Sequence, residues 1–380
     1  MRILHLSKYY HPYRGGIEKV IKELAESAFE QGHQVTVICS SENSKRKVET
    51  INGVRVIRLP QWGTMFSQPL TPSIFWGVQK EFQDAEVVHL HAPNPLFEFA
   101  CLSFDFKAPL VVTFHCEVMK ARWLNRFYEP VSKAILQKAN RILVATPLHI
   151  EHSFWLKDFA HKCEIIPFGI DPKFEKKSLE LNQHLHGIKS QYGRYFLFIG
   201  RMVTYKGVNI LLEAMQTVPQ NLILIGKGPY LERWKAMSRQ LNLADRVHFL
   251  GPVSSDEEFG AFLHGCDAVV LPSINEAEAF GLVLLEGMSC RKPAITTDLN
   301  SGVKFVNLDG ETGIEVPRGD ATSLAAAMND LRLNDELRLR LGEQAYLHFR
   351  KNFLISESLK KHLDVYLRLN REATGRTVAV

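Results

Sequence analysis

Short apolar runs alternate with stretches of helical periodicity along most of the 380-residue chain. Runs of about four to eight almost entirely apolar residues are typical of parallel strands that are buried on both faces. In the first half we predict strands over residues 2–7, 34–40, 87–92, 110–116, 141–145 and 164–167. Between the first two strands, apolar residues recur at helical spacing and predict a helix over 17–31: Ile17, Val20, Ile21, Leu24 and Ala28.

The second half repeats this alternation. We predict strands over residues 195–200, 221–226, 246–251, 268–272 and 293–297, and a last helix over 356–369. The stretch 167–193 has two prolines, many charges and no clear period, which predicts a connector between domains. Strands that alternate with helices form parallel sheets covered by helices. The chain is therefore predicted to be an α/β protein of two Rossmann-like, doubly wound domains.

The composition, with 46% hydrophobic and 23% charged residues, is that of a soluble globular protein. The six cysteines lie far apart and form no C-x-x-C pair, so neither a zinc site nor a disulfide framework is indicated. The N-terminus turns polar after about six residues, and no apolar run approaches the roughly 18 residues that span a bilayer. We expect a cytoplasmic protein without a bound metal.

The net charge of +5 is unevenly distributed along the chain. Residues 1–190 carry 24 Lys/Arg and 19 Asp/Glu, whereas residues 191–380 carry 22 of each. The excess is consistent with a solvated basic surface, or with attraction to anionic lipid or an anionic acceptor at the inner face of the membrane. No basic stripe with interleaved aromatic residues is present, so nucleic acid is not an expected partner.

A glycine pair, Gly15-Gly16, ends the loop after the first predicted strand and opens a helix. Glycines let the backbone approach a ligand, and free N–H groups at a helix start favour an anion such as a diphosphate. The alternative is a plain turn. The fingerprint G-x-G-x-x-G is absent at this point, which counts against NAD.

Two cations follow the first strand of the second domain, in Gly200-Arg201 and in Lys206-Gly207 before the next helix. Cations at the carboxyl end of a strand can hold a phosphate and stabilise the charge that builds up on a leaving group. The alternative is a pair of surface charges.

Two glutamates, Glu278 and Glu286, are separated by seven residues after the strand 268–272. We expect the first in a loop and the second in the next helix. Eight helical steps rise about 12 Å, whereas the two carboxylates of a retaining glycosidase lie about 5 Å apart. The pair is therefore expected to contact different parts of one extended ligand, unless Glu286 is merely a solvated or capping acid.

His115 ends the strand 110–116, at the carboxyl rim where ligands bind in open parallel sheets. A lone histidine is also common as a structural residue. Gly226 and Gly228 form another strand-to-helix turn at the rim of the second domain, which fits either a plain turn or a ligand contact.

These motifs together resemble those of the retaining glycosyltransferases with the GT-B fold and an E-x7-E motif, a family that includes bacterial mannosyltransferases and sucrose synthases. The resemblance spans nearly the whole chain. It implies two Rossmann-like domains that face a central cleft. Residues 1–168, joined by the C-terminal helix within 356–380, would form the acceptor side, and residues 169–355 would bind the nucleotide sugar. It also implies a metal-independent, nucleotide-sugar-dependent hexosyltransferase with no cofactor.

The resemblance further implies roles for the matched residues. Arg201 and Lys206 would neutralise the diphosphate in place of a metal, and Glu286 would accept the ribose hydroxyls. Glu278 would hold sugar hydroxyls, and His115 would contact the sugar while its carbonyl faces the anomeric carbon. The other expected donor-binding residues are Gly15, Gly16, Gly200, Gly228, Phe280, Gly281 and Leu282.

Segments 113–117, 205–207, 301–303 and 309–313 look most like the branch that transfers mannose or related sugars from GDP donors in surface-polysaccharide assembly. The family usually has His-Ser-Asp where this chain has His115-Cys116-Glu117, so contacts near that loop should differ. We predict retaining transfer of a hexose, mannose from GDP-mannose, to a lipid-linked or polysaccharide acceptor. The alternatives are a UDP-sugar-dependent transferase, a sugar-nucleotide epimerase and a non-catalytic nucleotide-binding protein.

Overall fold

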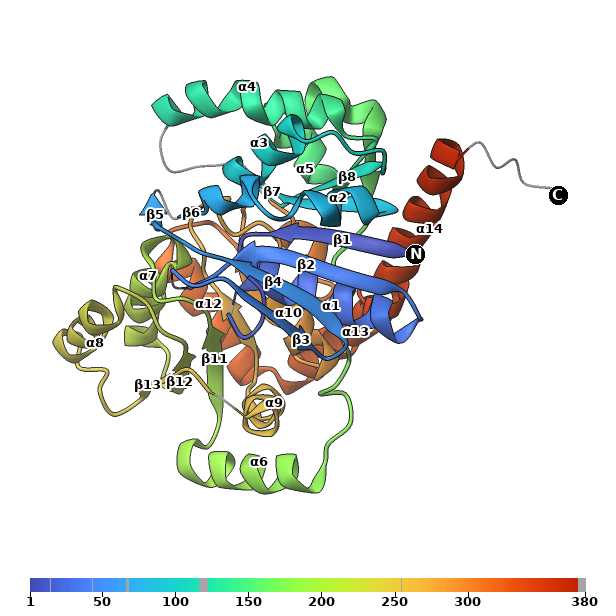
Figure 1. The fold of residues 1–380 in the computed structure, drawn as a ribbon. Coiled ribbons are helices and arrows are strands. Elements are labelled where there is room, and N and C mark those ends of the chain that lie inside the picture. Colours follow the sequence, from blue (N-terminus) through green and yellow to red (C-terminus); the bar gives the residue numbers. More distant parts are fainter. Residues whose placement is uncertain (14, 43, 66–67, 116–121, 254, 375–380) are drawn as a thin grey trace. The chain divides into compact units, whose positions relative to one another are not determined.

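The structure is a computed structural model that describes residues 1–374 apart from residues 14, 43, 66–67, 116–121 and 254. Contacts within the chain divide it into two compact units. Unit 1 comprises Met1–Asp171 and Ile355–Val380, and unit 2 comprises Pro172–Leu354. Each unit contains a largely parallel sheet with helices, labelled in Figure 1.

Unit 1 is built on an eight-stranded sheet with the order β10-β9-β8-β7-β1-β2-β4-β3. Neighbouring strands are parallel except β3 and β4, which are antiparallel. The order reverses between β1 and β7, so the sheet has its switch point there. The strands are β1 (Arg2–Ser7), β2 (Gln34–Ser40), β3 (Lys47–Ile51), β4 (Val54–Leu59), β7 (Val87–Ala92), β8 (Leu110–Phe114), β9 (Arg141–Val144) and β10 (Cys163–Ile165).

Helices and one small hairpin complete the described part of unit 1. The hairpin pairs β5 (Gly63–Met65) with β6 (Gln68–Leu70). The helices are α1 (Gly16–Glu30), η1 (Pro72–Phe75), α2 (Gln79–Asp84), α3 (Pro95–Ser103), α4 (Arg122–Lys138), α5 (Pro147–His152), η2 (Lys157–Lys162) and α14 (Ile355–Thr374).

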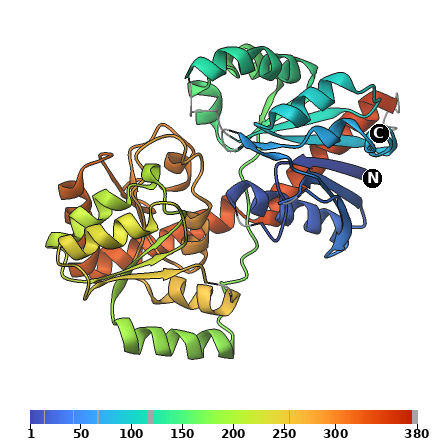
Figure 2. The same ribbon diagram turned by 60° about the vertical axis from the view of Figure 1, so that its left-hand side comes forward.

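Apolar clusters cover both faces of the unit 1 sheet because alternate strand residues point to opposite sides. One cluster joins the sheet to α2, α3 and α4. The other joins it to α1 and to α14, which contributes Leu359, Leu363 and Tyr366. Figures 1 and 2 show α14, in red, beside the N-terminal strands. The end of the chain is therefore part of the core of unit 1.

Unit 2 has a six-stranded, fully parallel sheet with the order β13-β12-β11-β14-β15-β16. The strands are β11 (Tyr195–Ile199), β12 (Asn221–Ile225), β13 (Val247–Gly251), β14 (Val269–Leu271), β15 (Ala294–Thr297) and β16 (Gly313–Val316). The helices are α6 (Leu179–Tyr192), η3 (Thr204–Lys206), α7 (Val208–Ala214), η4 (Met215–Thr217), α8 (Leu231–Gln240), α9 (Asp256–Gly265), α10 (Leu282–Ser289), α11 (Val303–Val306), α12 (Ala321–Leu333) and α13 (Asp335–Asn352).

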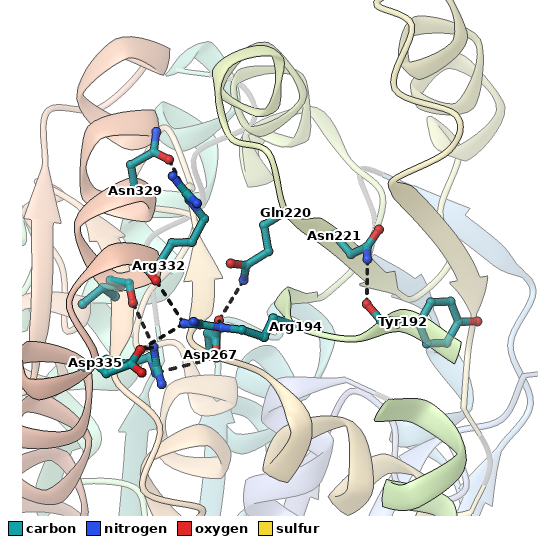
Figure 3. A network of polar contacts seen from close by, with 10 residues as sticks. Tyr192, Arg194, Gln220, Asn221, Asp267, Asn329, Arg332 and Asp335 are labelled. Carbon is teal, nitrogen blue, oxygen red and sulfur yellow. Dashed lines mark hydrogen bonds and ion pairs between the residues drawn. The ribbon is translucent and has the colours of Figure 1, made fainter. Parts of the chain in front are cut away.

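A polar network ties together the amino ends of the unit 2 strands (Figure 3). The carboxylate of Asp267, just before β14, accepts hydrogen bonds from Arg194 at 2.8 Å and Gln220 at 2.9 Å. These two partners precede β11 and β12. Arg194 also lies 3.3 Å from the carboxylate of Asp335, at the start of α13. The network is structural, since it lies at the edge of the sheet opposite to the carboxyl rim.

The prediction of a connector over 167–193 is wrong for its second half, which forms α6. Leu181, Leu185 and Ile188 are spaced at i, i+4 and i+7 and are buried. The Ser178 hydroxyl caps the helix by accepting from a backbone N–H, and Gly193 ends it with a φ of 61°. Figure 2 shows α6 alongside α9 within unit 2.

Each strand predicted from the sequence is present, with ends that shift by at most two residues. The predicted helix over 17–31 is α1, and the predicted last helix is α14. Strands β3, β4 and β16 and the short hairpin were not predicted from the sequence. Among the helices of the described residues, none is both long enough and apolar enough to span a bilayer.

Candidate active site

The expected phosphate-binding residues lie where the order of the unit 2 sheet reverses. β12 and β13 continue from β11 on one side, while β14, β15 and β16 follow on the other. In open parallel sheets, ligands bind outside the carboxyl ends of the strands at such a point. Gly200, Arg201 and Lys206 follow β11, and Ser273 and Glu278 follow β14. The sheet thus brings these five residues to one rim.

Lys206 and Glu278 form an ion pair at this rim, with side chains that are 11% and 9% exposed. The Ser273 hydroxyl donates a 2.8 Å hydrogen bond to the same carboxylate oxygen, Oε2. Burial lowers the pKa of Lys206, but the charge and hydrogen bond of Glu278 outweigh this effect and hold it above its ordinary value. The ammonium is therefore charged at neutral pH.

Arg201 adds a second positive charge beside this pair. Its side chain is exposed, and its charge is close enough to oppose protonation of Lys206. Among the described residues, Lys206 has a buried carboxylate as its ion-pair partner and Arg201 has no ion pair. Two cations at the carboxyl end of one strand suit an anionic ligand with more than one charge.

The position of Lys206 depends on two glycines. Gly207 has a φ of 67°, and a Cβ at this position would lie 1.9 Å from the carbonyl oxygen of Pro272, at the end of β14. A Cβ on Gly200 would lie 3.6 Å from the Lys206 ammonium. The lysine therefore folds back over Gly200, while Gly207 lets the chain press against the neighbouring strand.

Gly226 and Gly228 serve a packing role in the turn after β12. A Cβ on Gly226 would lie 1.9 Å from the carbonyl oxygen of Gly200, and a Cβ on Gly228 would lie 2.5 Å from that of Met202. The Met202 N–H also donates to the carbonyl of Lys227 at 3.0 Å. This close backbone contact accounts for the glycines whether or not the turn binds a ligand.

The second glutamate, Glu286, is buried in α10, four residues after the helix begins at Leu282. Gly281 precedes the helix in a left-handed conformation, with a φ of 75°. The Phe280 ring is buried and packs edge-on against Phe353, with ring centroids 6.0 Å apart. Glu278 precedes α10, which begins at Leu282, so the two glutamates do not lie on one continuous helix. The rise of about 12 Å for eight helical residues therefore does not give the distance between them.

Gly15 and Gly16 open α1 at the carboxyl end of β1 in unit 1, with Gly15 as the N-cap. The Glu18 carboxylate packs over the helix start, since a Cβ on Gly15 would lie 2.1 Å from its Oε2 atom. Glu18 is 7% exposed. A carboxyl group of the protein therefore already lies at this helix terminus, which is where a diphosphate was expected.

His115 directly follows β8 at the carboxyl rim of unit 1 and is 3% exposed. Its Nε2 atom lies 3.1 Å from Nδ1 of His91, and its ring stacks on Phe168 at 5.2 Å. Its carbonyl oxygen lies 3.3 Å from Nε2 of His149. Burial lowers the pKa of His115 to about 3, so the ring is neutral. Cys116 and Glu117 lie outside the described residues.

Unit 1 also contains a group of buried histidines that was not predicted from the sequence. His5 lies on β1 and His89 and His91 lie on β7, with three ring nitrogens within 4.8 Å of one another. These three form a group with metal-binding spacing within the described ranges of the chain. The signal was the alternation of histidine with apolar residues in Val87–Ala92, since a buried strand otherwise carries apolar residues on both faces.

Comparison with known proteins assigns the family. A model described as glycosyl transferases group 1 matches residues 187–348, and one described as glycosyltransferase family 4 matches residues 14–174. The chain is 32% identical over 355 residues to the D-rhamnosyltransferase WbpZ of Pseudomonas aeruginosa, covering 93% of this chain and 92% of that protein. The chain is a group 1 glycosyltransferase. The resemblance inferred from its motifs is thereby confirmed at the level of the family.

This glycosyltransferase is also 29% identical to the O-antigen chain mannosyltransferase C of Escherichia coli, over 97% of this chain and 99% of that one. Its structure resembles the sucrose-phosphate synthase of Thermosynechococcus elongatus with a TM-score of 0.78 and 22% identity, covering 97% and 98% of the two chains. The predicted α/β GT-B fold with two Rossmann-like domains is confirmed. The enzyme is a nucleotide-sugar-dependent glycosyltransferase, as predicted.

Proposed function

We propose that this glycosyltransferase moves a hexose, mannose from GDP-mannose, to a lipid-linked or polysaccharide acceptor with retention of the anomeric configuration. The names of the two relatives support the sugar and the acceptor class, since one is a mannosyltransferase of O-antigen chains and the other a D-rhamnosyltransferase. Guanine as the base of the donor is supported by the four segments that resemble the GDP-dependent branch of the family: 113–117, 205–207, 301–303 and 309–313. A UDP-sugar is the alternative donor.

The observation that carries the proposal is the buried pair of Lys206 and Glu278 at the rim of unit 2. Lys206 and Arg201 neutralise the diphosphate while its bond to the sugar breaks. A preorganised group aimed at developing charge contributes about 100-fold or more to the rate. Two cationic side chains can supply this stabilisation without a metal, so we expect transfer to continue in EDTA.

The remaining residues bind and orient the donor. Glu286 accepts the ribose hydroxyls from α10, Glu278 holds sugar hydroxyls beside the reacting carbon, and His115 contacts the sugar. The donor contacts that complete this assignment are Gly200, Gly228, Phe280, Gly281 and Leu282. Gly15 and Gly16 join them once the Glu18 carboxyl group moves away from the start of α1.

Retention proceeds on one face of the sugar. The bond between the anomeric carbon and the diphosphate oxygen breaks, and its electron pair leaves with the diphosphate. The acceptor hydroxyl attacks from the same face, and its proton passes to the departing phosphate oxygen. A carboxylate nucleophile is not required, which agrees with Glu278 being engaged by Lys206 and Ser273.

The enzyme acts in the cytoplasm in this proposal, and its basic N-terminal half contacts the anionic inner face of the membrane. The support is the excess of 24 Lys/Arg over 19 Asp/Glu in residues 1–190. Sedimentation with vesicles that contain anionic lipid, compared with neutral vesicles, tests this contact. Equal recovery with both vesicle types would contradict it.

The donor is tested by thermal shift with GDP-mannose, GDP, UDP-glucose and UDP. A ligand at 100 times its Kd adds about 2.7 kcal/mol to the stability of the folded state. Transfer from the preferred donor is then measured with a lipid-linked acceptor fraction, and the anomeric configuration of the product is read by NMR. A preference for UDP-glucose, or an inverted product, would overturn the corresponding part of the proposal.

The phosphate role is tested with Lys206→Ala and Arg201→Ala. We expect each to lower kcat/KM by about 100-fold. Lys235→Ala is the matched control because Lys235 also pairs with a glutamate, Glu232 at 2.9 Å, but on an exposed face of α8. A loss of only a few-fold in both test variants would contradict the proposed role.

A further inference from the structure

Three buried imidazoles in unit 1 form a continuous hydrogen-bonded series, which we term the histidine chain: His5, His91 and His115. Nδ1 of His5 lies 3.1 Å from Nε2 of His91, and Nδ1 of His91 lies 3.1 Å from Nε2 of His115. The residues come from three adjacent strands or their ends, β1, β7 and β8. The chain therefore runs from the switch point of the sheet to the rim that carries His115.

The imidazoles of the histidine chain are neutral. All three side chains are buried, at 0%, 4% and 3% exposure. Burial lowers the pKa of His5 and of His115 to about 3, and that of His91 well below its ordinary value. A neutral imidazole donates from one ring nitrogen and accepts at the other. The two hydrogen bonds of the chain must therefore point in the same direction.

The inner end of the chain decides this direction. Nε2 of His5 is buried and has no hydrogen-bond partner. Buried N–H groups without a partner are rarer in proteins than unpaired acceptors. The favoured tautomer of His5 thus has its proton on Nδ1, which donates to His91. His91 in turn donates from Nδ1 to Nε2 of His115, so the proton of His115 must be on Nδ1.

The outer end of the chain is Nδ1 of His115. Within the part of the protein that the structure describes, the hydrogen bonds of His115 use its Nε2 atom, its backbone N–H and its carbonyl oxygen, and none uses Nδ1. We propose that His5 and His91 are positioning residues that hold His115 as the Nδ1–H tautomer, so that it donates a hydrogen bond to an oxygen of the bound substrate. This inference rests on the proposed function, because it takes the sugar or phosphate oxygen near His115 as the acceptor.

A three-histidine metal site is the competing explanation, since His5, His89 and His91 offer nitrogens within 4.8 Å. Both ring nitrogens of His89 are already engaged, by the Tyr366 hydroxyl at 2.5 Å and the Thr113 hydroxyl at 2.6 Å. The rings of His89 and His91 also stack, with centroids 4.3 Å apart and planes 30° apart. Stacked rings direct their lone pairs side by side rather than toward one ion, which favours the hydrogen-bonded chain.

The tautomers are measured directly on the full-length protein labelled with 15N-histidine. Protonated and unprotonated ring nitrogens have well-separated 15N shifts, and long-range 1H–15N spectra assign them within each ring. We expect Nδ1–H on His5, His91 and His115. An Nε2–H tautomer at His115 would overturn the proposal, and so would a stoichiometric metal ion coordinated by His5 or His91. This measurement needs no activity and no variant that folds poorly.

Variants then test whether the tautomer matters to the reaction. His91→Phe removes the donor to His115, so we expect the Nε2–H tautomer to appear and kcat to fall by about 10- to 100-fold, as when other orienting partners of an imidazole are lost. KM for the donor should change by less than about 3-fold. His89→Phe is the matched control, because it deletes a neighbouring buried imidazole that is not part of the chain. His89→Phe should keep His115 as the Nδ1–H tautomer, even where the substitution lowers the stability of the protein.

The outcomes separate this inference from the proposed function. If His91→Phe changed the tautomer of His115 but left kcat unchanged, the proposal that His91 positions His115 for the reaction would be wrong. Loss of the His115 tautomer in His89→Phe would show that general packing, rather than the chain, sets it, and would also overturn the proposal. By contrast, a UDP-sugar preference in the donor screen would contradict the proposed donor and leave the chain intact.

Discussion

Lys206 and Glu278 meet across the two strands at which the order of the unit 2 sheet reverses, although 72 positions separate them in the sequence. The carboxylate neutralises the same ammonium that we assign to the diphosphate. A nucleotide-sugar must therefore compete with Glu278 for the Lys206 charge. Because of this competition, Glu278 should affect the affinity for the nucleoside diphosphate separately from its effect on kcat.

We predict that Glu278→Gln strengthens the binding of the nucleoside diphosphate product while it lowers kcat. The amide can still accept from Ser273 but no longer neutralises Lys206, so affinity for the diphosphate should rise by roughly tenfold, or about 1.4 kcal/mol. The variant should also lose stability without ligand, since removing one partner of a buried ion pair typically costs about 3–5 kcal/mol. Calorimetric titration and urea unfolding measure the two effects.

Glu232→Gln is the control for this prediction, because Glu232 pairs with Lys235 on an exposed helix face. It should change neither affinity nor stability measurably. If Glu278→Gln weakens diphosphate binding as strongly as Lys206→Ala does, the two side chains act together on the ligand rather than in competition.

Gly207→Ala should disrupt the rim more than backbone strain alone predicts. The left-handed φ of 67° costs any other residue about 1–2 kcal/mol, and the new Cβ would also clash with the carbonyl of Pro272. Gly319→Ala is the matched control, since Gly319 has a φ of 76° and open space around it. We expect Gly207→Ala to lose more stability than Gly319→Ala and to have a lower kcat/KM. Gly319→Ala should keep full activity. Equal losses in both variants would contradict the clash.

Hydrophobic patterning predicted the central strands because parallel strands buried on both faces are almost entirely apolar. It failed at β3, whose sequence Lys47–Ile51 is largely exposed and mixes charged with apolar residues. The missed signal was Asn52-Gly53, with φ values of 48° and 84°, a pair that favours a tight β-hairpin turn. Helix α6 was missed because its apolar face is narrow and lies between charged segments.

Motif spacing located Lys206 and Glu278 at strand ends but did not predict their contact. That contact depends on β11 and β14 being neighbours, which follows from the strand order rather than from the local sequence. The same limit applies to the histidine chain, since His5, His91 and His115 are adjacent only because β1, β7 and β8 are. The family resemblance supplied roles for single residues, and the pairing of strands supplied their partners.

The network at the amino ends of the unit 2 strands should affect stability without affecting transfer (Figure 3). Asp267→Ala leaves Arg194 and Gln220 without their shared acceptor, so we expect a loss of about 2 kcal/mol, less than for a fully buried pair because Arg194 is half exposed. Asp335→Ala, at a carboxylate that is 65% exposed, is the control and should not lower stability measurably. Both variants should keep kcat/KM within about 3-fold when fully folded. A 100-fold loss in Asp267→Ala would show that this edge is coupled to the site.

Unit 1 should lose stability as the pH falls below about 6.5, because its buried histidines resist protonation. Burial lowers the pKa of His5 to about 3 from an ordinary value of 6.5. Between these values the unfolded chain binds the proton and the folded chain does not, so the free energy of unfolding decreases as the pH falls. One such group contributes about 1 kcal/mol per pH unit well below pH 6.5.

His5→Phe should therefore reduce the slope of the unfolding free energy between pH 6 and pH 5 by about this amount, as measured by urea unfolding. Leu6→Ala is the control, since it removes buried volume from the same strand and should lower stability by about 2–5 kcal/mol equally at both pH values. An unchanged slope in His5→Phe would mean that His5 is protonated in the folded protein, which is incompatible with a neutral histidine chain.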